Sequence, residues 1–230
     1  MTETLLETVE AGVRDERARY SIIWMHGLGA DGHDFEPIVP ELRLPAEVPV
    51  RFVFPHAPVR PVTLNGGMAM RAWYDIVTLG GGAPQDAEGI KASAAAIEAL
   101  IEREAERGVP PERLVLAGFS QGGAIALHVA LRYPRRLAGI MGLSTYLPLE
   151  ERLESERHES NHGTPVFLAH GEMDPVLDIS LGRRARETLE RMGYPVEWHQ
   201  YPMVHQVCLE EIEAVSQWLQ RTLPRSGNQP

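Results

Sequence analysis

The sequence is poor in cysteine and contains no long apolar run. Its 230 residues include one cysteine, Cys208, so no disulfide can form within the chain, which is typical of a reducing compartment. No apolar stretch approaches the ~18 residues that a membrane-spanning helix requires. The residues that follow Met1 are acidic, whereas a secretion signal begins with basic residues. We therefore expect a cytoplasmic protein that is not an integral membrane protein.

Positive charge is also scarce. The chain has 22 lysines and arginines against 32 aspartates and glutamates, which gives a formal net charge of −10. The densest basic clusters are the pairs Arg135-Arg136 and Arg183-Arg184, which are too short to reverse this balance. Because such a charge repels phosphate backbones, the composition argues against nucleic acid as a partner.

Short apolar runs alternate with helical patterns along most of the chain. Apolar runs without polar alternation, bounded by glycine or proline, are typical of strands buried on both faces of a parallel sheet. We predict strands at residues 20–25, 50–54, 114–117, 137–143, 166–169 and 196–201, and helices at 86–107, 124–131, 181–192 and 209–219. This alternation predicts an α/β fold with a mostly parallel central sheet and helices on both faces.

The chain length and a hydrophobic content of 43% fit one domain, expected over residues 1–223, with a flexible polar tail at 224–230. Two segments break the rhythm of strands and helices: 57–84 is rich in glycine and proline, and 149–164 is strongly charged. We expect both to be irregular loops on the surface or facing the substrate.

The strongest sign of function is the sequence Gly118-Phe-Ser-Gln-Gly122, which lies between a predicted strand and a predicted helix. A serine on such a sharp strand-to-helix turn presents its hydroxyl at the carboxyl edge of the sheet, and glycines on both sides avoid steric collision. The amide of the next residue, Gln121, then points at the oxygen of an attacked carbonyl. We predict that Ser120 is a catalytic nucleophile.

A nucleophilic serine on such a turn needs a carboxylate and then a histidine further along the chain. Asp174 follows one predicted strand and His205 follows the next, so both lie at the carboxyl ends of strands, where α/β proteins place ligand sites. We predict that His205 is the base and that Asp174 orients it. The alternatives are the carboxylates Glu172 and Asp178 and the histidine His199, which falls inside a strand.

The glycine-rich loop after the first predicted strand has two interpretations. Its glycines spell Gly27-x-Gly-x-x-Gly32, the pattern of dinucleotide-binding proteins, which requires an acidic residue at the end of the next strand. That strand runs instead into Pro55-His56. We favour the second interpretation, a loop whose amides turn toward the nucleophile, so that Leu28 N–H joins Gln121 N–H in an oxyanion hole.

The sequence His158-Glu-Ser-Asn-His162 matches the His-Glu-x-x-His signature of zinc proteases. That chemistry needs both histidines on one face of a stable helix, with a third ligand nearby. The Ser-Asn pair in its middle and the Gly-Thr-Pro that follows disfavour such a helix. We therefore interpret the motif as a surface match and expect no metal.

Together these motifs resemble the acyl-protein thioesterase, or phospholipase/carboxylesterase, family of the α/β-hydrolases. The matching stretches span nearly the whole domain in family order: residues 26–32, 61–65, 68–76, 118–123, 143–148, 170–175 and 201–205. The resemblance implies an α/β-hydrolase fold without a large lid domain, action on esters or thioesters without a cofactor, and often a homodimer. Two residues depart from the usual family pattern. Glu172 leaves the proposed catalytic residues intact, and Val204, where the family often has glycine, is expected to alter slightly how the loop that carries His205 packs.

By the same resemblance, Leu28 and Gln121 supply the oxyanion hole, and the segment 64–76 helps to wall an acyl channel. Leu64, Met70 and Trp73 are the candidate lining residues, with ordinary core packing as the alternative for Trp73.

The expected function is therefore that of a serine carboxylesterase acting on a small-molecule ester or an acylated substrate with a short to medium acyl chain, with thioesters as a further substrate class. Acyl-protein thioesterase or lysophospholipase activity as the main activity is the alternative. A non-catalytic binding protein on the same fold and a nicotinamide-dependent dehydrogenase are rivals from other classes.

Overall fold

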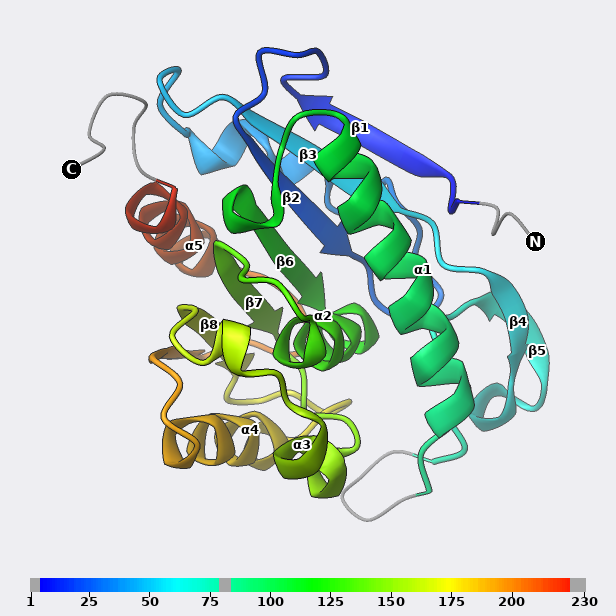
Figure 1. The fold of residues 1–230 in the computed structure, drawn as a ribbon. Coiled ribbons are helices and arrows are strands. Elements are labelled where there is room, and N and C mark those ends of the chain that lie inside the picture. Colours follow the sequence, from blue (N-terminus) through cyan, green and yellow to red (C-terminus); the bar gives the residue numbers. More distant parts are fainter. Residues whose placement is uncertain (1–4, 79–83, 224–230) are drawn as a thin grey trace.

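A seven-stranded sheet runs through the middle of the molecule in the order β1-β3-β2-β6-β7-β8-β9 (Figure 1). The computed structural model describes residues 5–78 and 84–223. β1 pairs antiparallel with β3, and every other neighbouring pair in this sheet is parallel. The strands are β1 (Thr8–Gly12), β2 (Tyr20–Met25), β3 (Val50–Pro55), β6 (Leu114–Phe119), β7 (Gly139–Leu143), β8 (Val166–Gly171) and β9 (Val196–Tyr201).

The mostly parallel sheet is the one that the sequence predicts, and each predicted strand is present with small shifts at its ends. Within this sheet, the strand that the sequence does not reveal is β1. It lies at the edge of the sheet and its residues are mostly only half-buried, so it has no continuous apolar run to mark it. The predicted tail at 224–230 lies outside the described residues.

Helices cover both faces of the sheet (Figure 1). On one face α1 (Ala87–Glu106), α2 (Gln121–Arg132) and α4 (Ile179–Arg191) share a hydrophobic cluster with the inward side chains of the strands. On the other face α5 (Leu209–Thr222) buries Trp218 and Leu219. Because the central strands are covered on both sides, nearly every residue in them is buried. Within residues 5–78 and 84–223 no helix has the length and apolar character to cross a membrane.

The two segments expected to be irregular contain regular structure. In the first, β4 (Val59–Val62) and β5 (Met68–Arg71) form an antiparallel pair, and the carboxylate of Asp75 accepts hydrogen bonds from the backbone N–H and hydroxyl of Thr63, at 2.7 and 2.6 Å. A two-stranded ribbon consists only of edge strands and therefore tolerates Pro61. The expectation of an irregular loop is therefore wrong for the part of the segment that forms β4 and β5.

In the second segment, α3 (Glu150–Glu156) and a short 3-10 turn (Glu159–Asn161) replace the expected loop. α3 is anchored by Leu153, which is fully buried in the cluster shared by α1, α2 and α4. Most of the other side chains of α3 are exposed, and for that reason the sequence of this segment looks like a solvated loop.

A buried ion pair joins α1 to the sheet. The side chains of Arg51 on β3 and Glu104 on α1 are 2% and 0% exposed, and Arg51 Nη1 lies 2.9 Å from Glu104 Oε2. The same oxygen accepts a hydrogen bond from the hydroxyl of Ser21 on β2, and Arg107 donates to Oε1. Both carboxylate oxygens of Glu104 are therefore satisfied, as a buried charge requires.

Replacing Glu104 with leucine leaves the Arg51 guanidinium buried without its carboxylate. We expect Glu104→Leu to lower the free energy of unfolding by about 3–5 kcal/mol, measured by urea denaturation followed by circular dichroism. Glu88→Leu is the control, because the Glu88 side chain is 87% exposed beside Lys91 and an exposed pair contributes at most about 1 kcal/mol. Equal losses in the two variants would contradict the expectation.

Candidate active site

Ser120 lies on a sharp turn between β6 and α2. Its φ is +54° and its ψ is −120°, a conformation that is strained for any residue other than glycine. A Cβ atom at Gly118 would collide with the carbonyl group of Gly122, and one at Gly122 would collide with the carbonyl oxygen of Met25. The strand, the turn and the helix predicted from the sequence are present, and the close packing explains both glycines.

Ser120, His205 and Asp174 form a continuous chain of hydrogen bonds. His205 Nε2 lies 2.9 Å from Ser120 Oγ, and His205 Nδ1 lies 2.6 Å from Asp174 Oδ2. Because an ionised carboxylate only accepts hydrogen bonds, Nδ1 carries the hydrogen and Nε2 is free to accept one from the serine hydroxyl. Ser120, Asp174 and His205 lie on three separate turns or loops of the chain. The structure therefore brings together the three residues that the sequence predicts to act together.

Asp174 is held in place by the turn that follows it. The residue is 7% exposed, and its Oδ1 accepts hydrogen bonds from the backbone N–H groups of Val176 and Leu177, at 2.8 and 2.9 Å. These two bonds leave Oδ2 facing His205, whose ring also packs against Phe119 with ring centroids 4.7 Å apart.

The alternative residues have other partners. Glu172 accepts a hydrogen bond from the side chain of Gln200, and Asp178 caps the N-terminus of α4 by accepting one from the Ser180 N–H. His199 lies inside β9, where its ring stacks on Phe167 and contacts Glu197. None of these contacts involves Ser120.

The two backbone amides expected to form an oxyanion hole border the same cavity as Ser120. Gln121 is the first residue of α2, where backbone N–H groups lack a partner within the helix. Its side chain is committed elsewhere: Oε1 accepts from the Trp73 N–H at 2.8 Å, and Nε2 donates to the Tyr74 carbonyl at 2.7 Å. Because the side chain of Gln121 is bonded to the protein, we expect a ligand to contact its backbone. Leu28 lines the cavity from the loop after β2.

A buried histidine holds the loop that carries Leu28. His26 Nδ1 lies 2.7 Å from the Gly27 carbonyl oxygen, and His26 Nε2 accepts a hydrogen bond from the Ala57 N–H at 3.1 Å. Burial lowers the pKa of His26, so its ring is neutral with the hydrogen on Nδ1. His26 is the first residue of the matching stretch 26–32, but no role for its side chain follows from the sequence motifs.

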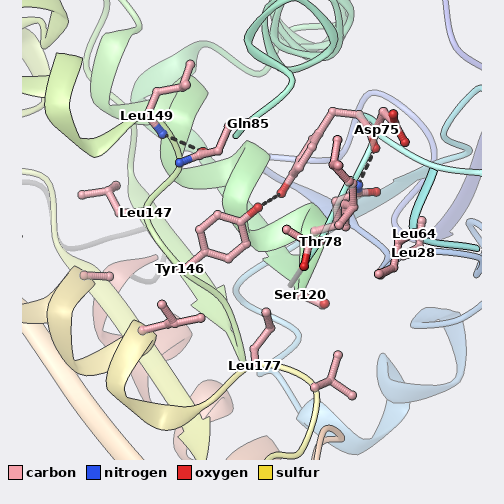
Figure 2. Close-up of a pocket in the computed structure, with 18 of the residues that line it drawn as sticks. Leu28, Leu64, Asp75, Thr78, Gln85, Ser120, Tyr146, Leu147, Leu149 and Leu177 are labelled. Carbon is pink, nitrogen blue, oxygen red and sulfur yellow. Dashed lines mark hydrogen bonds between the residues drawn. The ribbon is translucent and has the colours of Figure 1, made fainter. Parts of the chain in front are cut away.

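A cavity of about 760 Å³ extends from Ser120 and His205. Figure 2 shows Leu28 and Leu64 on one side of Ser120 and Leu147 and Leu149 on the other. Further apolar walls come from Ile76, Val77, Leu177, Leu181 and Ala185, whereas Asp34, Asp75, Glu150, Glu151, Arg152 and Arg184 add charge. A hollow with apolar walls beside a polar reactive group is typical of a site for a small organic ligand.

Tyr146 is a wall residue that the sequence analysis did not identify, although it lies within the matching stretch 143–148. Its hydroxyl is 2.6 Å from that of Tyr74 (Figure 2). Burial raises the pKa of the Tyr146 phenol, so the hydroxyl stays neutral inside the cavity.

Of the three candidate channel residues, only Leu64 is among the described residues that line this cavity. Trp73 is fully buried, and its indole N–H donates to the His26 carbonyl at 2.9 Å, so core packing accounts for it. Met70 lies in β5, where its sulfur accepts a hydrogen bond from Asn65 at 3.2 Å. Ile76, the last residue of the expected wall segment 64–76, lines the cavity together with Leu177 from the turn after β8, whereas Met70 and Trp73 are not among its lining residues.

The two histidines of the zinc-like motif have separate partners. His158 Nδ1 accepts a hydrogen bond from the Ser160 N–H, and His162 Nε2 lies 3.0 Å from the Met192 carbonyl oxygen. The segment between them is a 3-10 turn rather than a turn of α-helix. Among the residues that the structure describes, no group of three or more His, Cys, Asp or Glu side chains could hold a metal ion.

The order of the strands, the strained serine turn and the hydrogen-bonded side chains define the class of protein as an α/β-hydrolase. The model of the phospholipase/carboxylesterase family matches residues 7–223. The chain belongs to this family and is an ester-hydrolysing enzyme.

Relatives with known names are similar along most of their length. An acyl-protein thioesterase 1 of Neurospora crassa is 41% identical over 214 residues, which cover 89% of this chain and 87% of the relative. The structure of SOBER1 from Arabidopsis thaliana superposes with a TM-score of 0.85 at 32% identity, covering 90% of this chain and 100% of the other. Acyl-protein thioesterase 2 of Zea mays gives a TM-score of 0.84 at 31% identity, covering 95% of this chain and 99% of the other.

The serine turn leaves no room for a side chain at Gly122, and this can be tested. We expect Gly122→Ala to push α2 away from Met25 and to lower kcat for an aryl ester by roughly 10²-fold, because small displacements of reacting groups have effects of this size. Gly163→Ala is the control, since a Cβ there has no atom within 4 Å. Wild-type kcat in a folded Gly122→Ala variant would argue against a rigid turn.

Proposed function

We propose that this chain is a serine carboxylesterase in which Ser120 is the nucleophile, His205 the general base and acid, and Asp174 the group that orients His205. The observation that carries the proposal is the hydrogen-bonded chain from Ser120 Oγ through His205 to Asp174, with distances of 2.9 and 2.6 Å. It begins at a serine whose strained backbone presents the hydroxyl beside a cavity.

The proposed reaction has two steps. In the first, His205 Nε2 takes the Ser120 proton while Oγ attacks the ester carbonyl carbon, and the amides of Leu28 and Gln121 stabilise the negative oxygen. The tetrahedral intermediate then expels the alcohol or thiol, which takes the proton from His205, and an acyl-enzyme remains. In the second step, water attacks the acyl carbon while His205 takes a proton from it. The new tetrahedral intermediate expels Ser120 Oγ, which takes that proton back from His205, and the acid is released.

The substrate side of the proposal rests on the cavity and on the relatives. Apolar walls beside Ser120 suit the acyl part of an ester, and two of the relatives cited above, from Neurospora crassa and Zea mays, carry the name acyl-protein thioesterase. We propose esters with short to medium acyl chains as the main substrates, with thioesters as a second class. Acyl-protein thioesterase or lysophospholipase activity as the main function uses the same residues in the same steps.

A cytoplasmic location and a homodimeric state also belong to the proposal. The single cysteine supports the first and the family resemblance the second. Cell fractionation and light scattering of the purified protein test them.

Removing the serine hydroxyl tests the catalytic proposal directly. We expect Ser120→Ala to lower kcat for an aryl butanoate by roughly 10⁶-fold, because the loss of a nucleophilic serine costs about this much in other serine hydrolases. Thermal melting should show an intact fold. A fluorophosphonate should label the wild-type protein once per chain and leave Ser120→Ala unlabelled. Turnover at the wild-type rate in the variant would overturn the proposal, and absence of labelling in the wild type would favour a binding protein.

The chain-length preference tests the substrate class. We expect kcat/KM to be highest for butanoyl to octanoyl esters in a series of aryl esters measured beside acyl thioesters and lysophospholipids. Leu181→Trp, which fills part of the cavity, should reduce kcat/KM for octanoyl esters more than for acetyl esters. Val59→Trp is the control because Val59 is 63% exposed on β4. A lysophospholipid or a long-chain thioester as the best substrate would favour the alternative activity.

A further inference from the structure

His170 is a buried histidine that the proposed reaction does not use. It lies on β8 one residue before the end of the strand, and its side chain is 1% exposed. Its Nε2 lies 2.8 Å from the Leu177 carbonyl oxygen and 3.5 Å from Asp174 Oδ2. His170 therefore lies beside the buried Asp174 carboxylate, and it also contacts the turn on which that carboxylate depends.

The partners of His170 define its protonation state. A carbonyl oxygen can only accept a hydrogen bond, so Nε2 carries the hydrogen and donates it to Leu177. Burial lowers the pKa of the imidazole, which keeps the ring neutral and leaves Nδ1 as a bare acceptor. Nδ1 is buried and has no hydrogen-bond partner among the described residues. An unpaired buried nitrogen is unfavourable, so stability alone does not account for a histidine at this position.

Both backbone groups of Leu177 hold the turn from Asp174 to Leu177 in place. The Leu177 N–H donates to Asp174 Oδ1, while the Leu177 carbonyl accepts from His170. With Oδ1 occupied by backbone donors, Oδ2 is presented to His205 Nδ1 at 2.6 Å. Leu177 itself borders the cavity close to Ser120 (Figure 2), so the same turn also shapes the substrate wall.

The ring of His170 is in turn fixed by α4. A Cβ atom at Gly182, in the first turn of that helix, would lie 2.5 Å from His170 Nδ1. The absence of a side chain at Gly182 lets the helix pack directly on the imidazole. The ring therefore has little freedom to swing away from Leu177.

We propose that His170 is a positioning residue, which holds the Asp174–Leu177 turn so that Asp174 keeps His205 in the tautomer that accepts the Ser120 proton. The inference rests on the proposed function, because it concerns the same three residues. His170 touches neither substrate nor the reacting atoms, and it acts through Asp174.

Two substitutions separate hydrogen bonding from packing. His170→Leu removes the donor to Leu177, whereas His170→Gln keeps an amide N–H at a position similar to Nε2. We expect His170→Leu to lower kcat for an aryl butanoate by roughly 10- to 100-fold with KM within about threefold, by analogy with the losses seen when the groups that orient metal-ligating histidines are removed. His170→Gln should recover kcat to within about threefold of the wild type.

A matched control comes from His128 on α2, another buried histidine whose Nδ1 has no hydrogen-bond partner among the described residues. His128→Leu removes a comparable ring at a distance from the Asp174 turn and should leave kcat unchanged. Wild-type kcat in His170→Leu would overturn the inference, and so would a glutamine variant as impaired as the leucine variant.

Proton NMR gives a readout that does not depend on turnover. The short hydrogen bond from His205 Nδ1 to Asp174 should produce a low-field proton signal in the wild type, assigned by its loss in His205→Ala. We expect the signal to be weakened or moved upfield in His170→Leu and kept in His170→Gln. An unchanged signal in a folded His170→Leu would contradict the proposed role.

Gly182→Ala provides a second route if His170→Leu does not fold. It keeps the imidazole but forces it to shift, so it should lower kcat with KM unchanged, and a normal kcat would count against the inference. Ser120→Ala is assayed in the same series. Turnover at the wild-type rate in Ser120→Ala would refute the catalytic proposal itself. If Ser120→Ala is inactive and His170→Leu is fully active, only the role of His170 is refuted.

Discussion

The close approach of α2 to the end of β2 is the constraint on which the rest of the site depends. Gly122 allows the first turn of the helix to lie against the Met25 carbonyl, and the chain reaches that position only through the strained backbone of Ser120. One short turn therefore places Ser120 and Gln121, the first residue of α2, beside the same cavity. The packed sheet and helices around this turn hold the strain, because a buried interior has little room in which to relax.

Around that turn, the ring nitrogen that carries the hydrogen in each of three histidines is determined by a neighbouring oxygen that can only accept a hydrogen bond. The Asp174 carboxylate sets the tautomer of His205, the Gly27 carbonyl that of His26, and the Leu177 carbonyl that of His170. His26 and His170 are kept neutral by burial, since desolvation lowers the pKa of both rings. The loop that carries Leu28 and the turn that carries Asp174 are thus fixed before a substrate arrives, and such preorganisation is a large part of catalysis in acyl-transfer enzymes.

Most of the fold and the central residues of the site could be predicted from the sequence, and the exceptions have physical causes. β1 was missed because an edge strand is only partly covered and has no continuous apolar run. The β4–β5 pair was missed because a ribbon of two edge strands tolerates a proline that would break an inner strand. Trp73 was considered for the acyl channel, yet its indole N–H is bonded to the His26 carbonyl in the core. Aromatic side chains occur both in protein cores and in ligand pockets, so the residue type alone does not distinguish a core position from a pocket position.

The sequence by itself determined the parallel sheet, the serine turn and the order in which a carboxylate and a histidine follow it, because these depend on neighbouring residues and on strand periodicity. Only the tertiary structure decided that Asp174 rather than Glu172 or Asp178 faces His205, that Leu177 lines the cavity while Trp73 packs in the core, and that His170 closes the turn behind Asp174. These outcomes depend on contacts between β8, β9, α4 and the segment around β5, which are far apart in the chain. Local patterns specify where the backbone turns, whereas the packing of distant elements specifies which side chains meet.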